Sequence, residues 1–275
     1  MADTKGPILN GVHKDPSGLL PGTTFPEKSQ VHQNGVQSQE DATSFDGPTV
    51  DGRPTTTTFF KPLQLRGSPL LPSLYSMINR AFNQGHMHNG VQILPGLRLR
   101  SDGQFFEELG TEPGTFTYII YYTGTDDVVG TASAKRYLGR MLVVDQADDR
   151  DSRRAATWKR FGPVPHEAAA WELSTMAVDP DVHKQGIASY LMKLVEDEMR
   201  SRYRAILEEA SEDEKPNRLW TLITTIKERH FDFYSRRNFV IDEEKRYEKG
   251  WLDSRTGECY VVTFSVPVYA FANDL

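Results

Sequence analysis

The sequence predicts a mixed α/β fold of the α+β kind, in which about four helices flank one twisted sheet of six or seven strands. Three observations support this prediction. Residues 171–191 have the pattern of a strand that turns through glycine into a helix. Residues 117–122 and 128–135 are rich in β-branched and aromatic side chains and are joined by turn residues, so they predict a hairpin. Strand-like and helix-like segments then alternate toward the C-terminus, as they do where helices cover a sheet.

The globular region is expected to begin near Thr55 and to extend to residue 275. Threonine and phenylalanine dominate residues 57–63, which form the first predicted strand. Apolar residues then recur at helical spacing over 74–82, and a shorter helix is predicted over 101–109. The hairpin follows these two helices.

The second half of the region is predicted to begin with a long surface loop over residues 145–169, which mixes basic and acidic side chains with Gly162-Pro163-Val164-Pro165. A strand over 171–178 then leads into a helix that begins at Gly186 and ends before the polar residues 211–216. The last predicted elements are a buried strand over 219–226, a short helix over 228–237, and strands at 240–241 and 260–266.

Residues 1–54 differ from the rest of the chain. They are rich in Gly, Pro, Ser, Thr, Gln and Asp, and they contain few periodic apolar residues. Such a segment cannot bury enough apolar surface to offset the entropy cost of ordering it. We therefore expect a flexible or loosely packed N-terminal extension. A regulatory or dimer-bridging arm is the functional alternative.

The composition of the whole chain excludes several classes of function. A net charge of −6 and a pI near 5.7 argue against a nucleic-acid binder, whose surface would be basic. A single cysteine, Cys259, excludes an intrachain disulfide and a multi-cysteine zinc site, and the seven histidines lack metal-ligand spacing, so no metal is expected. Neither a secretory signal nor an apolar run of ~20 residues is present, so we expect a cytoplasmic protein without membrane contact. We expect a monomer or a homodimer.

The turn between the 171–178 strand and the following helix is suited to holding an anion. The first N–H groups of a helix have no partner inside the helix, and the helix dipole adds partial positive charge there. Gly186 has no side chain, so a phosphate can approach the main chain closely. His183 and Lys184 can add cationic side chains beside that phosphate.

The residues of this turn resemble the acetyl-CoA motif of the GNAT superfamily of N-acetyltransferases. The family motif reads Arg/Gln-x-x-Gly-x-Gly/Ala, often after Val-Asp-Pro. His183 stands where Arg or Gln is usual, while the closing Gly-x-Ala fits the motif. The matching residues of this chain are His183-Lys184-Gln185-Gly186-Ile187-Ala188 after Val178-Asp179-Pro180.

A second segment resembles the family's Phe-Tyr-x-x-x-Gly-Phe signature. It reads Phe233-Tyr234-Ser235-Arg236-Arg237-Asn238-Phe239. Asn238 replaces the glycine, and asparagine is the next best residue for a left-handed helix cap. Both signatures occur in the family's order, and the resemblance covers about residues 55–270. It implies the GNAT fold, whose central sheet is mixed and mostly antiparallel.

The resemblance also implies acetyl-CoA as a cosubstrate and an amine as the acceptor. It assigns the diphosphate of CoA to the main-chain N–H groups of residues 185–189. It assigns the pantetheine arm and the thioester oxygen to the main chain of residues 176–178, if that strand splays away from its neighbour. The expected cofactor-binding residues are Met176, Ala177, Val178, His183, Lys184, Gln185, Gly186, Ile187, Ala188 and Ser189.

Direct acyl transfer to an amine requires a base. An alkylamine with a pKa near ~10.4 is only about one part in two thousand neutral at pH 7. Glu172 lies where several family members keep a catalytic glutamate, and burial beside Trp171 and Leu173 would raise its pKa. The alternatives are that Glu172 is a solvated strand residue or an ion-pair partner, and that the base is the His166-Glu167 pair.

The resemblance identifies Tyr234 as the general acid that protonates the leaving thiolate of CoA. The alternative is a tyrosine that only packs its helix onto the sheet. The function we expect is acetyl transfer from acetyl-CoA to a primary amine of a small molecule. Two other functions stay open: acetylation of a protein lysine or N-terminus, and a non-catalytic CoA-binding module.

Overall fold

The computed structural model describes residues 42–85, 87–88, 91–92, 98–111, 113–137, 141–144, 156–159, 168–216, 218–247 and 259–270. All described residues belong to one compact unit of the chain, residues 39–275.

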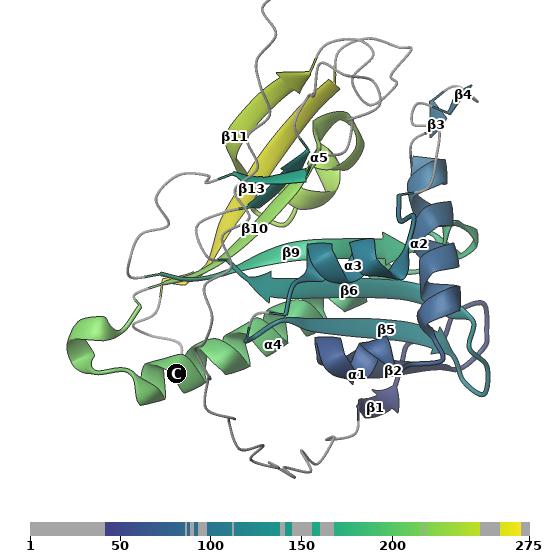
Figure 1. The fold of residues 1–275 in the computed structure, drawn as a ribbon, viewed down its shortest axis with the longest axis horizontal. Helices are drawn as coiled ribbons and strands as arrows, with labels where there is room; N and C mark the ends of the chain where they lie inside the picture. Colours follow the sequence, from purple (N-terminus) through teal and green to yellow (C-terminus); the bar gives the residue numbers. More distant parts are fainter. Residues whose placement is uncertain are drawn as a thin grey trace, which may run out of the picture. The chain divides into compact units, whose positions relative to one another are not determined.

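An eight-stranded sheet forms the centre of this unit (Figure 1). Every neighbouring pair of strands is antiparallel except β9 and β10, which run parallel. In spatial order, the strands are β1 (Thr43–Asp46), β2 (Thr55–Phe60), β5 (Phe116–Tyr122), β6 (Val128–Arg136), β9 (Ala168–Val178), β10 (Arg218–Ile226), β13 (Cys259–Ala270) and β11 (Val240–Tyr247).

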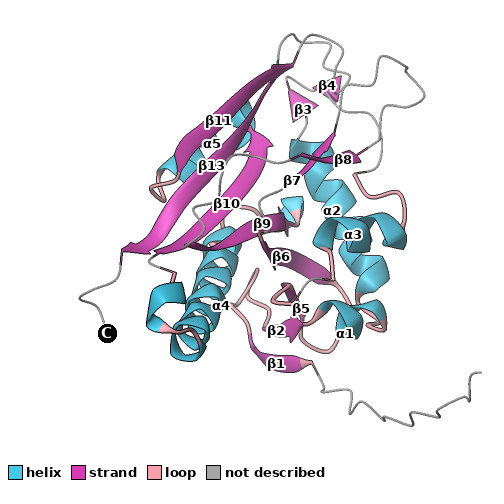
Figure 2. Cartoon of the chain, turned by 60° about the vertical axis from the view of Figure 1, so that its left-hand side comes forward, coloured by secondary structure: helices cyan, strands magenta, loops and turns pink. Residues whose placement is uncertain are grey.

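The helices cover both faces of the sheet (Figure 2). Helices α4 and α5 share one face, and α1, α2 and α3 share the other. Among the described helices, none combines the length and the apolar character needed to cross a membrane. The helices are α1 (Pro62–Arg66), α2 (Leu71–Gly85), α3 (Asp102–Leu109), α4 (Ile187–Glu209) and α5 (Lys227–Ser235).

Each face of the sheet has its own apolar core. The core beneath α4 and α5 includes Trp171 and Leu191, which are 1% and 0% exposed. The core beneath α1, α2 and α3 includes Leu74 and Ile119, which are both fully buried. Gly130 allows α4 to approach the sheet, because a Cβ at this position would lie only 3.0 Å from Cγ2 of Ile187.

The predicted fold class is confirmed, with a mixed and mostly antiparallel sheet in the predicted order of strands and helices. The sheet has one strand more than expected, because β1 pairs with β2 in the register Thr43↔Phe59 to Asp46↔Thr56. Residues 43–46, which were counted with the expected extension, thus form part of the sheet. Residues 1–41 of the expected extension lie outside the described residues.

Four further segments differ from the predictions. The short helix α1 ends the first strand at Phe60, because Pro62 suits the first turn of a helix. The expected loop 145–169 contains β8 (Ala156–Lys159), which pairs with β7 (Met141–Val144), and it also contains the start of β9. The strand predicted at 240–241 continues to Tyr247, because residues 243–247 pair with β13 as well. A small hairpin of β3 (Met87–His88) and β4 (Val91–Gln92) was not predicted.

Candidate functional site

The pairing of β9 with β10 ends halfway along both strands. The parallel register runs from Arg218↔Ala168 to Leu222↔Glu172, while β9 continues to Val178 and β10 to Ile226. We call this divergence, made by residues 173–178 and 223–226, the strand fork. Figure 1 shows β10 turning away from β9 where the fork opens. The splaying expected of the 171–178 strand is therefore present.

Main-chain groups of β9 point into the strand fork. The N–H of Asp179 donates to the carbonyl oxygen of Val129 at 2.9 Å, on the β6 side of the strand. Because hydrogen-bonding directions alternate along an antiparallel pair, the N–H groups of Ala177 and Thr175 also face β6, and those of Met176 and Val178 face the opposite side. These two N–H groups are available to an extended ligand that lies beside β9.

A bulge in β9 lies just below these groups. The register with β6 passes from Ser133↔Thr175 to Ala134↔Leu173, so Ser174 is the extra residue. A bulge twists and bends its strand locally. The bend follows Glu172, the last residue of β9 that pairs with β10, and so coincides with the start of the strand fork.

The connection from β9 to α4 forms a turn of unusual backbone conformation. We call residues 183–186 the glycine turn. Lys184 and Gly186 both have positive φ, at 67° and 81°, and Gly186 is the N-cap of α4. For a lysine this conformation costs about 1–2 kcal/mol. Within the described residues, the N–H groups of residues 185–189 donate no hydrogen bond, so they remain available to an anion.

The side chains of the glycine turn lie on the surface of the protein. His183, Lys184 and Gln185 are all exposed. Nε2 of His183 lies 3.2 Å from the carbonyl oxygen of Val178, which faces the strand fork. Ile187 is instead a core residue, 2% exposed, so only its main chain can contribute to a site. Ala177 likewise packs its side chain into the core beneath α2.

Tyr234 reaches the strand fork from the α4 and α5 face of the sheet. It lies on α5, is 5% exposed, and its hydroxyl donates to Sδ of Met176 on β9 at 4.0 Å. Burial raises the pKa of Tyr234 above its ordinary value, and the nearby Arg237 offsets only part of this rise. The phenol therefore keeps its proton at neutral pH. Asn238 has φ of 63°, as predicted for the residue that replaces a capping glycine.

Glu172 lies on the opposite face of the sheet, at the point where the fork begins. It is 8% exposed, and its Oε2 is 3.4 Å from Nζ of Lys135, which is 4% exposed. The same ammonium donates to the carbonyl oxygen of Glu108 at the end of α3 at 2.7 Å. Glu172 is therefore a buried ion-pair partner, as in one of the alternatives above, and its position at the fork is compatible with a proton-transfer role.

An arginine that the sequence did not single out joins α5 to the start of α4. Arg237 donates from Nη2 to Oγ of Ser189 at 2.6 Å and from Nη1 to the carbonyl oxygen of Phe233 at 2.8 Å. Its guanidinium also stacks on the ring of Phe233, 3.7 Å from the ring centroid. This contact ties the helix of Tyr234 to the first turn of α4, beside the glycine turn.

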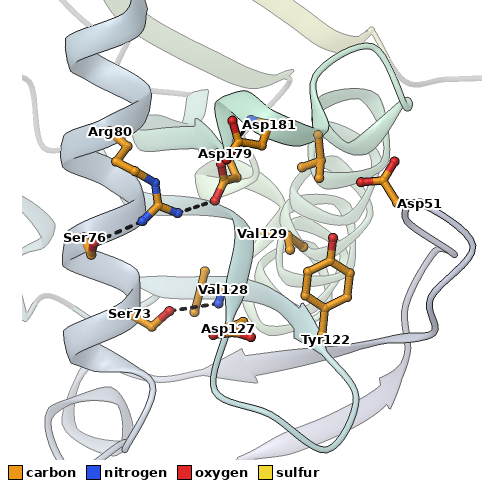
Figure 3. Close-up of a pocket in the computed structure, with 11 residues that line it drawn as sticks. Asp51, Ser73, Ser76, Arg80, Tyr122, Asp127, Val128, Val129, Asp179 and Asp181 are labelled. Carbon is orange, nitrogen blue, oxygen red and sulfur yellow. Dashed lines mark hydrogen bonds and ion pairs between the residues drawn. The ribbon is translucent and has the colours of Figure 1, made fainter.

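A polar pocket of about 430 Å³ lies at the C-terminal end of β9, on the side of α2 (Figure 3). Arg80 of α2 bridges Ser76 and Asp179 there, and Ser73 accepts a hydrogen bond from the N–H of Val128. Asp51 enters from the opposite side, on the turn that precedes β2. The pocket contains none of the residues proposed from the sequence. Its acidic members are Asp51, Asp127, Asp179 and Asp181.

Other residues considered in the sequence do not join this site. Lys227 forms an ion pair with Glu244, with Nζ 2.7 Å from Oε2. The alternative base His166-Glu167 lies outside the described residues, as does the side chain of Cys259. In the described part of the chain, no group of three or more His, Cys, Asp or Glu side chains is arranged to hold a metal ion.

Comparison with known proteins identifies one family. A model described as the acetyltransferase (GNAT) family matches residues 72–221, which is more than half of the chain. No curated protein matches the sequence.

Similar solved structures include the ribosomal-protein-S18-alanine N-acetyltransferase from Escherichia coli, with 15% identity over 80% of this chain and 98% of that chain and a TM-score of 0.45. An aminoglycoside 6'-N-acetyltransferase complexed with coenzyme A has 12% identity over 79% of this chain and 99% of its own, with a TM-score of 0.43. NAA60 from Arabidopsis thaliana in complex with acetyl-CoA has 14% identity over 60% of this chain and 85% of its own, with a TM-score of 0.35.

The buried pair of Lys135 and Glu172 leads to a stability prediction. Lys135→Met should lower the free energy of unfolding by about 3–5 kcal/mol, because it leaves a buried carboxylate without its counter-charge. The double variant Lys135→Met/Glu172→Leu should recover most of this loss, because both charges are then gone. Urea unfolding at pH 7 measures both.

The matched control is Lys193→Met, which removes a lysine whose side chain is 72% exposed and whose Nζ is 2.6 Å from Oδ2 of Asp197. This surface pair should contribute less than ~1 kcal/mol to the free energy of unfolding. If Lys135→Met loses no more stability than Lys193→Met, the buried pair is not an important interaction.

Proposed function

The chain belongs to the acetyltransferase (GNAT) family, and from this premise we propose that it transfers an acetyl group from acetyl-CoA directly to a primary amine of a small molecule. One observation carries the proposal. The strand fork has a buried carboxylate, Glu172, on one face of the sheet and a protonated phenol, Tyr234, on the other. Such an arrangement allows the amine and the thioester to approach the fork from opposite faces.

The glycine turn and the fork together fit the polar parts of acetyl-CoA. The N–H groups of residues 185–189 donate to no protein group within the described residues, and they suit the two phosphates of the diphosphate. His183 and Lys184 lie beside them as exposed cations or hydrogen-bond donors. The N–H groups of Met176 and Val178 suit the amides of an extended pantetheine arm and the oxygen of the thioester.

Glu172 is the proposed general base. The amine has to lose a proton before or during its attack on the thioester carbon, and a carboxylate at the start of the fork can accept this proton directly or through a water molecule. Lys135 holds the side chain of Glu172 in place, because its ammonium is anchored at the same time to the end of α3.

Tyr234 is the proposed general acid. Cleavage of the thioester releases a thiolate whose conjugate thiol has a pKa near ~8.5. The raised pKa of the phenol keeps the hydroxyl protonated, so it can donate a hydrogen bond that stabilises the developing thiolate. Its packing against Phe233 and Phe239, with ring centroids 5.0 and 5.4 Å away, fixes the direction of the hydroxyl.

A small-molecule acceptor is favoured over a protein by the chain segment next to Glu172. The segment leaves β6 after Arg136, includes the β7 and β8 hairpin, and returns at Ala168, four positions before Glu172. We propose a small-molecule acceptor on the ground that this segment begins and ends beside the proposed base, where Lys135 and Arg136 pair with Glu172 and Trp171. The open alternatives are a protein lysine or N-terminus and a CoA-binding module without turnover.

A panel of amines tests the proposal. We expect release of free thiol from acetyl-CoA with at least one small primary amine, detected by a thiol reagent, and a product heavier by one acetyl group in mass spectrometry. Acetylated protein bands from labelled acetyl-CoA, without turnover of small amines, would favour the protein acceptor. Binding of CoA without turnover of either class would favour the non-catalytic module.

Gly186→Val should raise the KM for acetyl-CoA by about 10-fold or more, because the new side chain covers the N–H groups that would hold the diphosphate. The substitution also strains the backbone, since Gly186 has φ of 81°. Gly124→Val is the matched control: this glycine has φ of 82°, has open space around it, and lies in the turn between β5 and β6. A KM within about twofold of wild type for Gly186→Val would mean that the diphosphate binds elsewhere.

Tyr234→Phe should lower kcat by about 10-fold or more with little change in the KM for acetyl-CoA, because the proton donor is lost while the packing is kept. Tyr203→Phe is the matched control. Tyr203 is a second buried tyrosine, but its hydroxyl donates to the carbonyl oxygen of Pro216, at 2.6 Å, in the helix-to-strand connection. Equal kcat values for the two variants in steady-state kinetics would mean that Tyr234 only packs its helix onto the sheet and does not donate a proton.

A further inference from the structure

The tight turn between β1 and β2 lies against the glycine turn. Val50 and Arg53 pair through two hydrogen bonds. The N–H of Val50 donates to the carbonyl oxygen of Arg53 at 3.0 Å, and the N–H of Arg53 donates to the carbonyl oxygen of Val50 at 2.9 Å. Asp51 and Gly52 between them have φ of 49° and 73°. Positive φ at both central residues belongs to the two-residue turn for which Asp-Gly is a favoured sequence.

Contacts on both sides fix the position of this turn. Val50 is fully buried in the core that also contains Ile187 and Leu191 of α4. The guanidinium of Arg53 lies over the ring of Tyr122, 3.5 Å from its centroid. The turn is therefore attached to the sheet on one side and to the start of α4 on the other.

Asp51 makes two reciprocal hydrogen bonds with the side chain of Gln185. The main-chain N–H of Asp51 donates to Oε1 of Gln185 at 2.9 Å, and Nε2 of Gln185 donates to Oδ1 of Asp51 at 2.5 Å. The oxygen of the Gln185 amide thus accepts a hydrogen bond and its nitrogen donates one, both within the same contact. These residues are 134 positions apart in the chain, so only the tertiary fold brings them together.

Gln185 occupies the middle of the glycine turn, between the two residues with positive φ. A lysine held in a left-handed conformation needs neighbouring contacts that favour it over the ordinary conformations. The paired hydrogen bonds to Asp51 are such contacts. They also direct the side chain of Gln185 toward the turn between β1 and β2. This direction leaves the N–H groups of residues 185–189 uncovered.

We infer that Asp51 is a positioning residue for the cofactor: through Gln185, it holds the glycine turn in the conformation that binds the diphosphate of acetyl-CoA. This inference rests on the proposed function. It makes residues 43–53 part of the acetyl-CoA site, although no side chain among them needs to touch the ligand. The role of Asp51 is one of geometry, because a carboxylate by itself would repel a diphosphate.

A set of variants of the full chain distinguishes an effect of the hydrogen bonds between Asp51 and Gln185 from an effect of the charge of Asp51. Gln185→Ala loses both hydrogen bonds, and the Kd for CoA and the KM for acetyl-CoA should rise about 5- to 10-fold, with kcat within about twofold of wild type. Asp51→Ala loses one bond and should raise both constants about 3- to 5-fold. Asp51→Asn keeps the acceptor and the main-chain donor, so both constants should stay within about twofold of wild type.

The double variant Asp51→Ala/Gln185→Ala should bind CoA no more weakly than Gln185→Ala, because both substitutions remove the same contact. Asp126→Ala is the matched control. It removes an exposed carboxylate from the β5 and β6 turn, which does not contact Gln185, and should leave all constants unchanged. Calorimetry measures Kd, steady-state kinetics measures KM and kcat, and thermal unfolding checks that the variants are folded.

Three results would overturn the inference. The first is wild-type affinity for CoA in both Asp51→Ala and Gln185→Ala. The second is an equal change in Asp51→Ala and Asp51→Asn, which would assign the effect to charge. The third is an additive loss in the double variant. In all three cases wild-type protein still binds CoA, whereas an absence of CoA binding by the wild-type protein would contradict the proposed function itself.

Discussion

The end of pairing between β9 and β10 is the constraint on which the rest of the site depends. Main-chain N–H groups in the middle of a sheet are normally paired, because an unpaired buried donor costs free energy. The strand fork leaves such groups on β9 without a strand beside them. An extended ligand with its own amides can occupy that place as an added strand would. The bulge at Ser174 coincides with the divergence and bends β9 there.

The two layers of helices give the two sides of the fork different chemistry. On one side, α5 brings Tyr234 against Met176, and Arg237 ties α5 to the first turn of α4. On the other side, the end of α3 anchors Lys135, which in turn holds Glu172. The proposed base Glu172 and the proposed acid Tyr234 therefore lie on opposite faces of the sheet.

The turn between β1 and β2 shows how a segment that was expected to be a loose extension can pack beside the glycine turn. Residues 43–54, which form β1 and the turn before β2, are polar and lack a helical or alternating apolar pattern, so composition indicated a loosely packed segment. The Asp51-Gly52 pair was a local signal for a tight turn that the composition argument did not use. Val50 then supplies the buried anchor, and the turn reaches Gln185.

The sequence by itself determined the fold class, the order of the main strands and helices, and the position of the glycine turn. These depend on local properties: residue period in the strands and helices, glycine at the N-cap of α4, and asparagine in the left-handed cap after α5. Tyr234 was also singled out from the sequence, because its motif is contiguous in the chain, and its role as general acid stays a prediction.

Only the tertiary structure decided which partners meet. The ion pair of Glu172 with Lys135, the contact of Arg237 with Ser189 and the pairing of Asp51 with Gln185 each join residues that lie tens of positions apart or more. Such features arise from contacts between distant segments, which no local pattern of residues encodes.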